Sequence, residues 1–282
     1  MRLIRSFAAS FFSIAVLAAA SSAQNLKPQE IIDKHLAAIG TREKRDSIKT
    51  LMAVGLSEFE SKVPLVKGGG KAILVSDPED LFFVLSLNSR EYPFEKVGFF
   101  GDKVSLPYSF AGTRSLLGHF LAENSKILSD GLFSGIMSLR WPLFGLDKRK
   151  VRIESGGTKK IGGKKMNVLE FNPAGAASSE LKTRLYFDSE TYNHVRSEYR
   201  REISVGNVTF GQANQQGTSI LVLTEEFSDF KNEDGLNLPH SYRVTFQSNS
   251  NSSDYENSWG MKVSQYYFNQ QLASDFFTFE TK

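Results

Sequence analysis

A helical stretch near the middle of the chain constrains the fold more than any other feature, because nearly everything after residue 48 on either side has the pattern of β-strands. Between residues 113 and 145, apolar residues recur at steps of three and four, with polar residues such as Arg114, Glu123 and Lys126 between them. This pattern predicts one or two short amphipathic helices with a wide apolar face. Burial of each large side chain contributes roughly 1.5 to 3 kcal/mol, so we expect this face to pack against a curved sheet.

The first 23 residues have the pattern of a cleaved signal peptide. Arg2 and Arg5 precede an apolar run over residues 7–20, and the small residues at 21–23 follow it. The run is short for a membrane span, although a transmembrane anchor is the alternative interpretation. We expect cleavage after Ala23 and a mature chain of residues 24–282 that forms a single domain.

The composition excludes several classes of site. The 282 residues contain no cysteine, which excludes a thiol nucleophile, a disulfide framework, a cysteine-ligated metal and lipidation at the cleavage site. The formal charge of +3, from 34 basic and 31 acidic residues, falls to +1 when Arg2 and Arg5 leave with the signal peptide. The net charge therefore gives no argument for binding of nucleic acid.

Strand patterns fill most of the mature chain. A helix is predicted at residues 28–39, with Pro28 at its start and Gly40 after its end, and the apolar period then becomes alternating. Pro239 is expected to fix the entry to the strand that follows it, because proline has no backbone donor. About ten or eleven strands are predicted, mostly as a meander, at residues 48–59, 70–76, 81–88, 95–101, 150–155, 164–171, 181–188, 193–205, 219–227, 242–246 and 260–269.

No pattern of catalytic or metal-binding residues can be recognised. The four histidines lack HxH or HExxH spacing, no GxSxG is present, and the GGGK at residues 68–71 lacks the spacing of a phosphate loop. Carboxylates such as Asp188, Glu225 and Glu226 are interpreted as lying on turns or on outward-facing strand positions, so a solvated surface is favoured over a general acid/base pair. We therefore expect a protein that is not an enzyme and has no metal and no cofactor.

Three segments of the C-terminal half carry family features. Residues 184–203 contain a strand that ends in an acidic residue and a short turn, residues 225–246 contain a DG turn followed by LPH and a strand, and residues 265–277 contain an N-x-x-L-x-x-x-F ending. Together with the signal peptide, the helix at 28–39 and the central helices, these features resemble the bacterial outer-membrane lipoprotein-sorting (LolA-like) superfamily. The resemblance implies a mainly β (α+β) fold, in which a curved, incomplete antiparallel barrel is closed by helices that act as a plug or lid.

The resemblance also implies a periplasmic carrier that holds the acyl chains of a lipoprotein or another lipid in a cavity between the sheet and a central helical plug at residues 113–140. A chain of about 16 carbons at about 0.8 kcal/mol per CH₂ would give about 12 kcal/mol, roughly nanomolar affinity before ordering costs. Donor and acceptor proteins in the two membranes are the expected protein partners, and a monomer is the expected state. The predicted cavity residues are Leu116, Leu117, Phe120, Leu121, Leu128, Leu132, Phe133, Ile136, Met137 and Trp141.

Other functional classes remain open at this point. An envelope interaction or stress-sensing protein would share the fold without lipid transport, and its helices would be permanently packed in a filled interior. An enzyme would require an inward-facing pair of carboxylates or histidines. A transmembrane barrel is disfavoured by charges on both strand faces, as at Arg200 and Arg201, and by the C-terminal residue Lys282.

Overall fold

The computed structural model describes residues 26–90, 92–109, 112–148, 151–173, 181–206, 216–249, 254–273, 276–277 and 279. The predicted signal peptide and its cleavage site after Ala23 lie outside the described residues. No helix in the described part of the chain has the length and apolarity that a membrane span requires.

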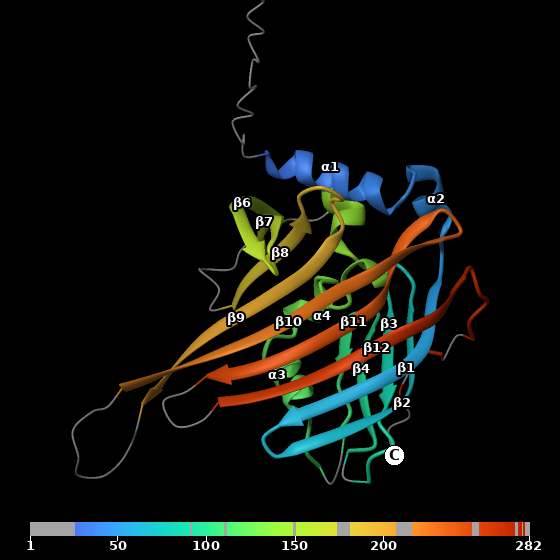
Figure 1. Cartoon of the computed structure of the whole chain (residues 1–282). Coiled ribbons are helices and arrows are strands. Elements are labelled where there is room, and N and C mark those ends of the chain that lie inside the picture. The colour runs from blue at the N-terminus through green and yellow to red at the C-terminus, as the bar shows by residue number, and fades with distance from the viewer. Residues whose placement is uncertain are drawn as a thin grey trace, which may run out of the picture.

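Twelve antiparallel strands form one open, curved sheet, which confirms the predicted fold class (Figure 1). The order across the sheet is β5-β4-β3-β2-β1-β12-β11-β10-β9-β8-β7-β6, so β1 and β12 are the only neighbours in it that do not follow one another in the chain. The strands are β1 (Leu51–Lys62), β2 (Leu65–Ser76), β3 (Leu81–Ser86), β4 (Phe94–Phe100), β5 (Lys103–Ser105), β6 (Val151–Ile161), β7 (Lys164–Pro173), β8 (Leu181–Asp188), β9 (His194–Gly206), β10 (Gln216–Glu233), β11 (Leu236–Asn249) and β12 (Asp254–Phe268).

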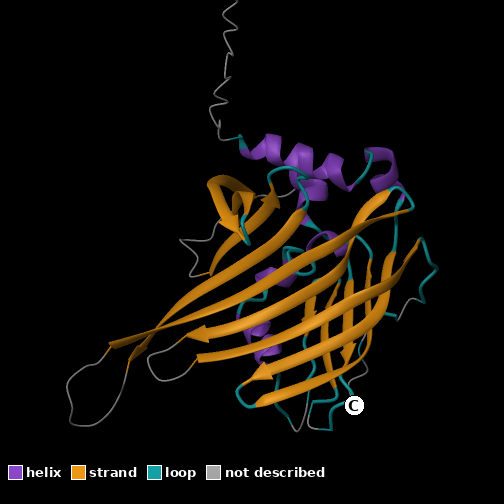
Figure 2. Cartoon of the chain, in the orientation of Figure 1, coloured by secondary structure: helices purple, strands orange, loops and turns teal. Residues whose placement is uncertain are grey.

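The helices cover one end of the sheet and fill its concave side (Figure 2). Helix α1 lies across the end of the sheet, and its bounds are those predicted from the sequence. The central stretch folds into short helices that lie between the two halves of the curved sheet, as expected for a plug. The helices are α1 (Pro28–Ile39), α2 (Arg42–Ser47), α3 (Leu116–Glu123) and α4 (Lys126–Ser129), with the 3₁₀ helices η1 (Gly135–Met137) and η2 (Pro142–Lys148).

Alternating side chains explain why one face of the sheet is buried. On β8, Leu185 and Phe187 point into the core, and Lys182 points outward. The inward residues of the strands, the apolar face of α1 and the plug form one continuous hydrophobic cluster. The plug is therefore part of the main core of the protein.

Several strands extend beyond their predicted bounds, as β6 does to Ile161 and β10 to Glu233, and two further details differ from the predictions. Strand β5 has only three residues, too few for its alternation to be recognised. Strand β11 begins at Leu236, so Pro239 lies inside it and does not mark its entry. Proline is tolerated there because the ladder between β11 and β12 begins only at Ser241, so one side of β11 has no ladder partner at Pro239.

Candidate functional site

The plug begins with a well-capped helix. Ser115 is the N-cap of α3, and its Oγ accepts a hydrogen bond from the backbone N–H of Gly118 at 2.8 Å. At the other end, the Asn124 side chain donates to the carbonyl of Phe120 at 2.8 Å. These local bonds form a short helix whose apolar residues share one face, and that face packs against the sheet.

Nine of the ten predicted cavity residues are brought together in the core, each with no more than 3 % of its surface exposed, and the tenth, Leu116, is 39 % exposed. The ring of Phe120 lies 5.7 Å from that of Phe246 on β11, and Trp141 stacks on His194 at 4.6 Å. In this conformation the side chains of the plug themselves occupy the concave side of the sheet. Their role as a cavity lining stays a prediction.

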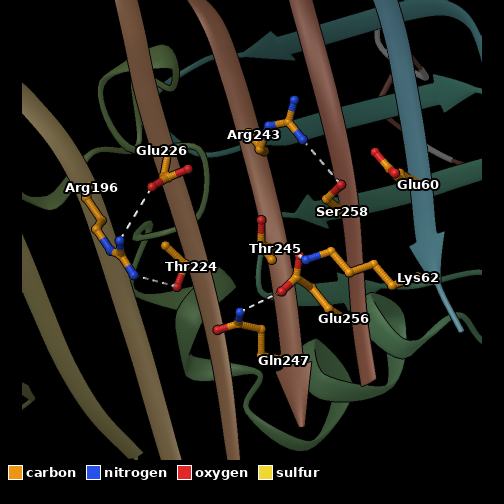
Figure 3. Close-up of a pocket in the computed structure, with 10 residues that line it drawn as sticks. All are labelled: Glu60, Lys62, Arg196, Thr224, Glu226, Arg243, Thr245, Gln247, Glu256 and Ser258. Atoms are coloured by element: carbon orange, nitrogen blue, oxygen red, sulfur yellow. Dashed lines mark hydrogen bonds and ion pairs between the residues drawn. The ribbon is translucent and has the colours of Figure 1, made fainter. Parts of the chain in front are cut away.

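Two cavities lie outside the interface between plug and sheet. One, of about 310 Å³, is bounded by Met52, Tyr267 and the segment after β12. The other, of about 390 Å³, is a polar groove on the outer face of the sheet (Figure 3). Side chains from β9, β10, β11, β12 and β1 line this groove: Glu60, Lys62, Arg196, Thr224, Glu226, Arg243, Thr245, Gln247, Glu256 and Ser258.

The charges of the outer groove are largely paired with one another. Lys62 lies 2.6 Å from Glu256, and Arg196 lies 3.4 Å from Glu226. Arg243 donates to the Ser258 hydroxyl at 3.4 Å. Three basic and three acidic side chains line the groove, so it offers neither an apolar surface for an acyl chain nor an excess charge for an ion.

A buried carboxyl group joins the plug to the centre of the sheet. Glu225 on β10 is fully buried, which shows that its interpretation as an outward-facing residue was wrong. Its Oε1 accepts hydrogen bonds from the Ser134 N–H at 2.7 Å and from the Tyr242 hydroxyl at 2.5 Å. Its Oε2 accepts from the Tyr199 hydroxyl at 2.7 Å. Burial raises the pKa of Glu225 to about 7, although the three hydrogen bonds oppose this rise.

A second buried carboxyl group lies at the start of the plug. Glu95 on β4 is 2 % exposed and accepts a short hydrogen bond from the Tyr92 hydroxyl, which in turn accepts from the Trp259 indole N–H at 2.8 Å. The side chain of Ser115, the N-cap of α3, also bonds to Glu95. Burial raises the pKa of Glu95 to about 7. Glu95 therefore contacts the plug through the Ser115 hydroxyl, and Glu225 contacts it through the Ser134 backbone N–H.

A buried arginine stabilises the plug from within. The Arg140 guanidinium donates from Nη1 to the carbonyl of Leu128 at 2.5 Å and from Nη2 to the carbonyl of Ser129 at 3.1 Å, at the end of α4. It also lies 3.7 Å from the centre of the Phe99 ring on β4. The Leu128 carbonyl also accepts from the Gly131 N–H at 3.0 Å, so the guanidinium adds a second donor there and a first one at Ser129, in the last turn of the helix, and its contact with Phe99 brings α4 close to the sheet.

Two histidines are buried where α1 meets the plug. His35 contacts the carbonyl of Tyr192 through Nδ1 at 3.0 Å and accepts from the Trp141 indole through Nε2 at 3.2 Å, so Nδ1 carries the proton of the neutral ring. Burial lowers the pKa of His35 to about 4. The pKa of His194, whose ring lies 6.1 Å away, is also lowered by burial and by His35. Both rings pack against aromatic side chains, His35 against Phe187 and His194 against Trp141, and no cluster of metal ligands is found among the described residues.

Sequence reasoning missed the two buried carboxyl groups that contact the plug, although a signal for them exists. Glu225 alternates with Leu223 and Phe227, which face the core, and Glu95 alternates with Val97 and Phe99. A carboxylate that shares a strand face with such residues is expected to point inward.

Comparisons with known proteins give structural likenesses only. No protein-family model matches the chain, and no curated protein matches its sequence significantly. A LolA superfamily protein from Nitrosomonas europaea is 14 % identical, with 90 % of this chain and 98 % of that chain covered and a TM-score of 0.47. A putative outer membrane lipoprotein-sorting protein domain from Vibrio parahaemolyticus is 12 % identical, with 88 % and 94 % covered and a TM-score of 0.45.

A third solved structure, a DUF1329 family protein from Desulfovibrio piger, is 12 % identical, with 89 % of this chain and 96 % of that chain covered and a TM-score of 0.41. The first two structures carry the name of the superfamily that the C-terminal motifs resemble.

Proposed function

We propose that the protein is a periplasmic, non-enzymatic carrier that binds the acyl chains of a lipoprotein or another lipid against the concave side of its sheet. The single observation that carries this proposal is that the plug is an apolar occupant of that concave side, joined to the sheet by a small set of polar contacts. When the plug moves aside, it uncovers a continuous apolar surface that an acyl chain can cover in its place.

The interaction energies fit such an exchange. An acyl chain that replaces the plug restores the apolar contacts that the sheet loses, at about 0.8 kcal/mol per CH₂. Opening exposes the apolar face of the plug and breaks its polar contacts with Glu225 and Glu95, because these two carboxyl groups have no partner in an acyl chain. Release would follow from the plug returning to its closed position.

Locking the plug to the sheet tests this proposal. Glu123 at the end of α3 pairs with Arg201 on β9 at 3.0 Å, and both side chains reach solvent. Because the natural chain has no cysteine, the double variant Glu123→Cys/Arg201→Cys has only two thiols, which a short bifunctional maleimide can join. We expect the joined protein to lose uptake of a fluorescent fatty acid, and the same variant before joining to retain it.

Two further variants provide a matched pair on one helix. Phe120→Asp places a charge on the buried face of α3, whereas His119→Asp places it on the exposed face. Lipid retention should be lost in the first variant and kept in the second. Equal uptake by the locked and unlocked proteins, or unchanged retention in folded Phe120→Asp, would refute a carrier that opens at the plug.

The filled interior favours a second candidate, a non-enzymatic envelope interaction or stress-sensing protein. Nine of the predicted cavity residues, which belong to the plug or directly follow it, are already buried against the sheet, as expected if the helices are a permanent part of the core. Mass spectrometry of the organic-soluble material that copurifies with the natural protein separates the two candidates. A stoichiometric lipid supports the carrier, and a clean protein that also fails to bind fatty acid supports the interaction protein.

A further inference from the structure

Resting on the proposed function, we infer that Glu225 selects acyl ligands in which the chain is joined to the rest of the molecule by an amide. In the closed structure Glu225 binds a backbone amide N–H, and that N–H belongs to the segment that a ligand would replace. The plug therefore presents to the sheet the same donor group that an N-acyl ligand carries beside its chain.

The donor reaches Glu225 through an unusual turn. Ser134 has a φ of 68° and Gly135 has a φ of 48°, so two consecutive residues adopt the left-handed conformation. A Cβ at Gly135 would lie 2.8 Å from the Phe227 ring and 2.9 Å from Nδ1 of His194, which leaves room only for glycine. This turn pushes the backbone against β9 and β10 and directs the Ser134 N–H to Oε1 of Glu225 at 2.7 Å.

Two side chains of the sheet bond to the acceptor, and one of them, Tyr199, also donates to the Leu132 carbonyl of the plug at 3.2 Å. Tyr199 comes from β9 and Tyr242 from β11, the two strands that flank β10, and their hydroxyls bond to the two oxygens of Glu225. Among the described residues, the hydrogen-bond partners of Glu225 are these two hydroxyls and the Ser134 N–H, with no cation. His194, the first residue of β9, is a buried titratable group that packs against Gly135 of the turn.

Movement of the turn would leave one acceptor position of Glu225 without a partner inside an apolar surface. Leu223 and Phe227 flank Glu225 on the same face of β10 and offer no donor. A ligand that supplies an N–H at this point restores the bond, whereas an ester places an oxygen lone pair against the carboxyl group. The amide should therefore bind about ten times more tightly than the ester, because an unpaired buried polar group is costly.

A ligand pair that differs in one group tests the inference. N-ethyl dodecanamide and ethyl dodecanoate are compared for displacement of cis-parinaric acid, a fluorescent fatty acid, from the mature protein. Both ligands must displace the plug, so the ratio of their affinities does not contain the cost of opening. We expect the natural protein to prefer the amide about tenfold, and Glu225→Met to lose this preference and to favour the ester, since an amide is the costlier group to transfer out of water.

Glu95→Met is the matched control, since it removes the other buried carboxyl group and leaves the acceptor of the Ser134 N–H in place. The ratio of its affinities for the amide and the ester should equal that of the natural protein. The inference is overturned if the natural protein binds the amide and the ester with about equal affinity, or if Glu225→Met leaves the ratio of the two affinities unchanged. The proposed function stands in either case as long as cis-parinaric acid binds. If cis-parinaric acid does not bind at all, the proposed function fails and the inference fails with it.

A last comparison distinguishes the two sources of such a ligand. N-dodecanoyl ethanolamine represents an N-acylated lipid, and an N-dodecanoyl hexapeptide represents an N-acylated protein end. If either ligand binds more tightly than ethyl dodecanoate, the result supports the amide contact and identifies the class of cargo. Failure of both to bind more tightly than ethyl dodecanoate contradicts it.

Discussion

Replacement of Glu225 by glutamine should change how the stability of the protein depends on pH. Burial raises the pKa of this carboxyl group from 4.5 to about 7. The folded protein therefore holds a proton between these pH values that the unfolded chain releases, and the free energy of unfolding falls as the pH rises through this range. A shift of one pKa unit corresponds to 1.36 kcal/mol, so the titration of Glu225 lowers the free energy of unfolding by about 3 kcal/mol between pH 4.5 and pH 7. Above pH 7 it causes no further change.

Other buried groups also titrate in this range, so a difference between two proteins is the informative quantity. Glu95 contributes with the same sign as Glu225, because its pKa is also raised to about 7. His35 and His194 contribute with the opposite sign, because their pKa values lie below 6.5 and protonation favours the unfolded chain as the pH falls. Subtraction of the Glu225→Gln curve from the natural curve removes these shared contributions.

Urea unfolding followed by the fluorescence of Trp141 and Trp259, at intervals from pH 4.5 to pH 8, measures both curves. The stability advantage of the natural protein over Glu225→Gln should shrink by about 3 kcal/mol between pH 4.5 and pH 7. Glu226→Gln, which changes the exposed neighbour on the same strand, serves as the control and should give a parallel curve. A Glu225→Gln curve that also runs parallel to the natural one would refute the reasoning.

Three further perturbations probe the plug and its surroundings. His35→Gln should reduce the loss of stability on acidification from pH 6.5 to pH 4, because the pKa of His35 is lowered to about 4, and acid unfolding followed by circular dichroism measures it. Arg140→Met should lower the free energy of unfolding by about 1 to 3 kcal/mol in urea, because the carbonyl of Ser129 loses the guanidinium donor at 3.1 Å; an unchanged urea midpoint would contradict this role. Gly135→Ala should destabilise by about 1 to 3 kcal/mol, since its Cβ would meet the Phe227 ring and its φ is positive, and a melting temperature equal to that of the natural protein would show that the turn can relax.

Much of the fold could be predicted because alternation and helical periodicity are local properties of the sequence. Helix α1 has the predicted bounds, since proline at its start and glycine after its end fix both of them. Burial of the plug also follows from local pattern, because a wide apolar face inside a run of strands has no other place to pack. Strand β5 was missed because three residues carry too little pattern.

The polar contacts of the plug depend on information that is not local. The inward position of Glu225 could have been recognised from its alternation with Leu223 and Phe227. Its partners could not, because Tyr199 and Tyr242 reach it only through the registers of β9 and β11 against β10. The donor on the plug side arises from a serine in a left-handed conformation, which is an uncommon choice for a residue other than glycine.

The pairing of β1 with β12 has a consequence for how the protein folds. These strands lie side by side in the middle of the sheet, although one is near the beginning of the folded chain and the other near its end. Contacts between residues so distant in sequence form slowly, because the chain loses the entropy of closing a long loop before the contacts stabilise it. The edge of β1 therefore stays unpaired until β12, the last strand, has been synthesised and can pair with it. During this interval the nascent chain is most exposed to aggregation, and assistance from a chaperone would have its greatest effect.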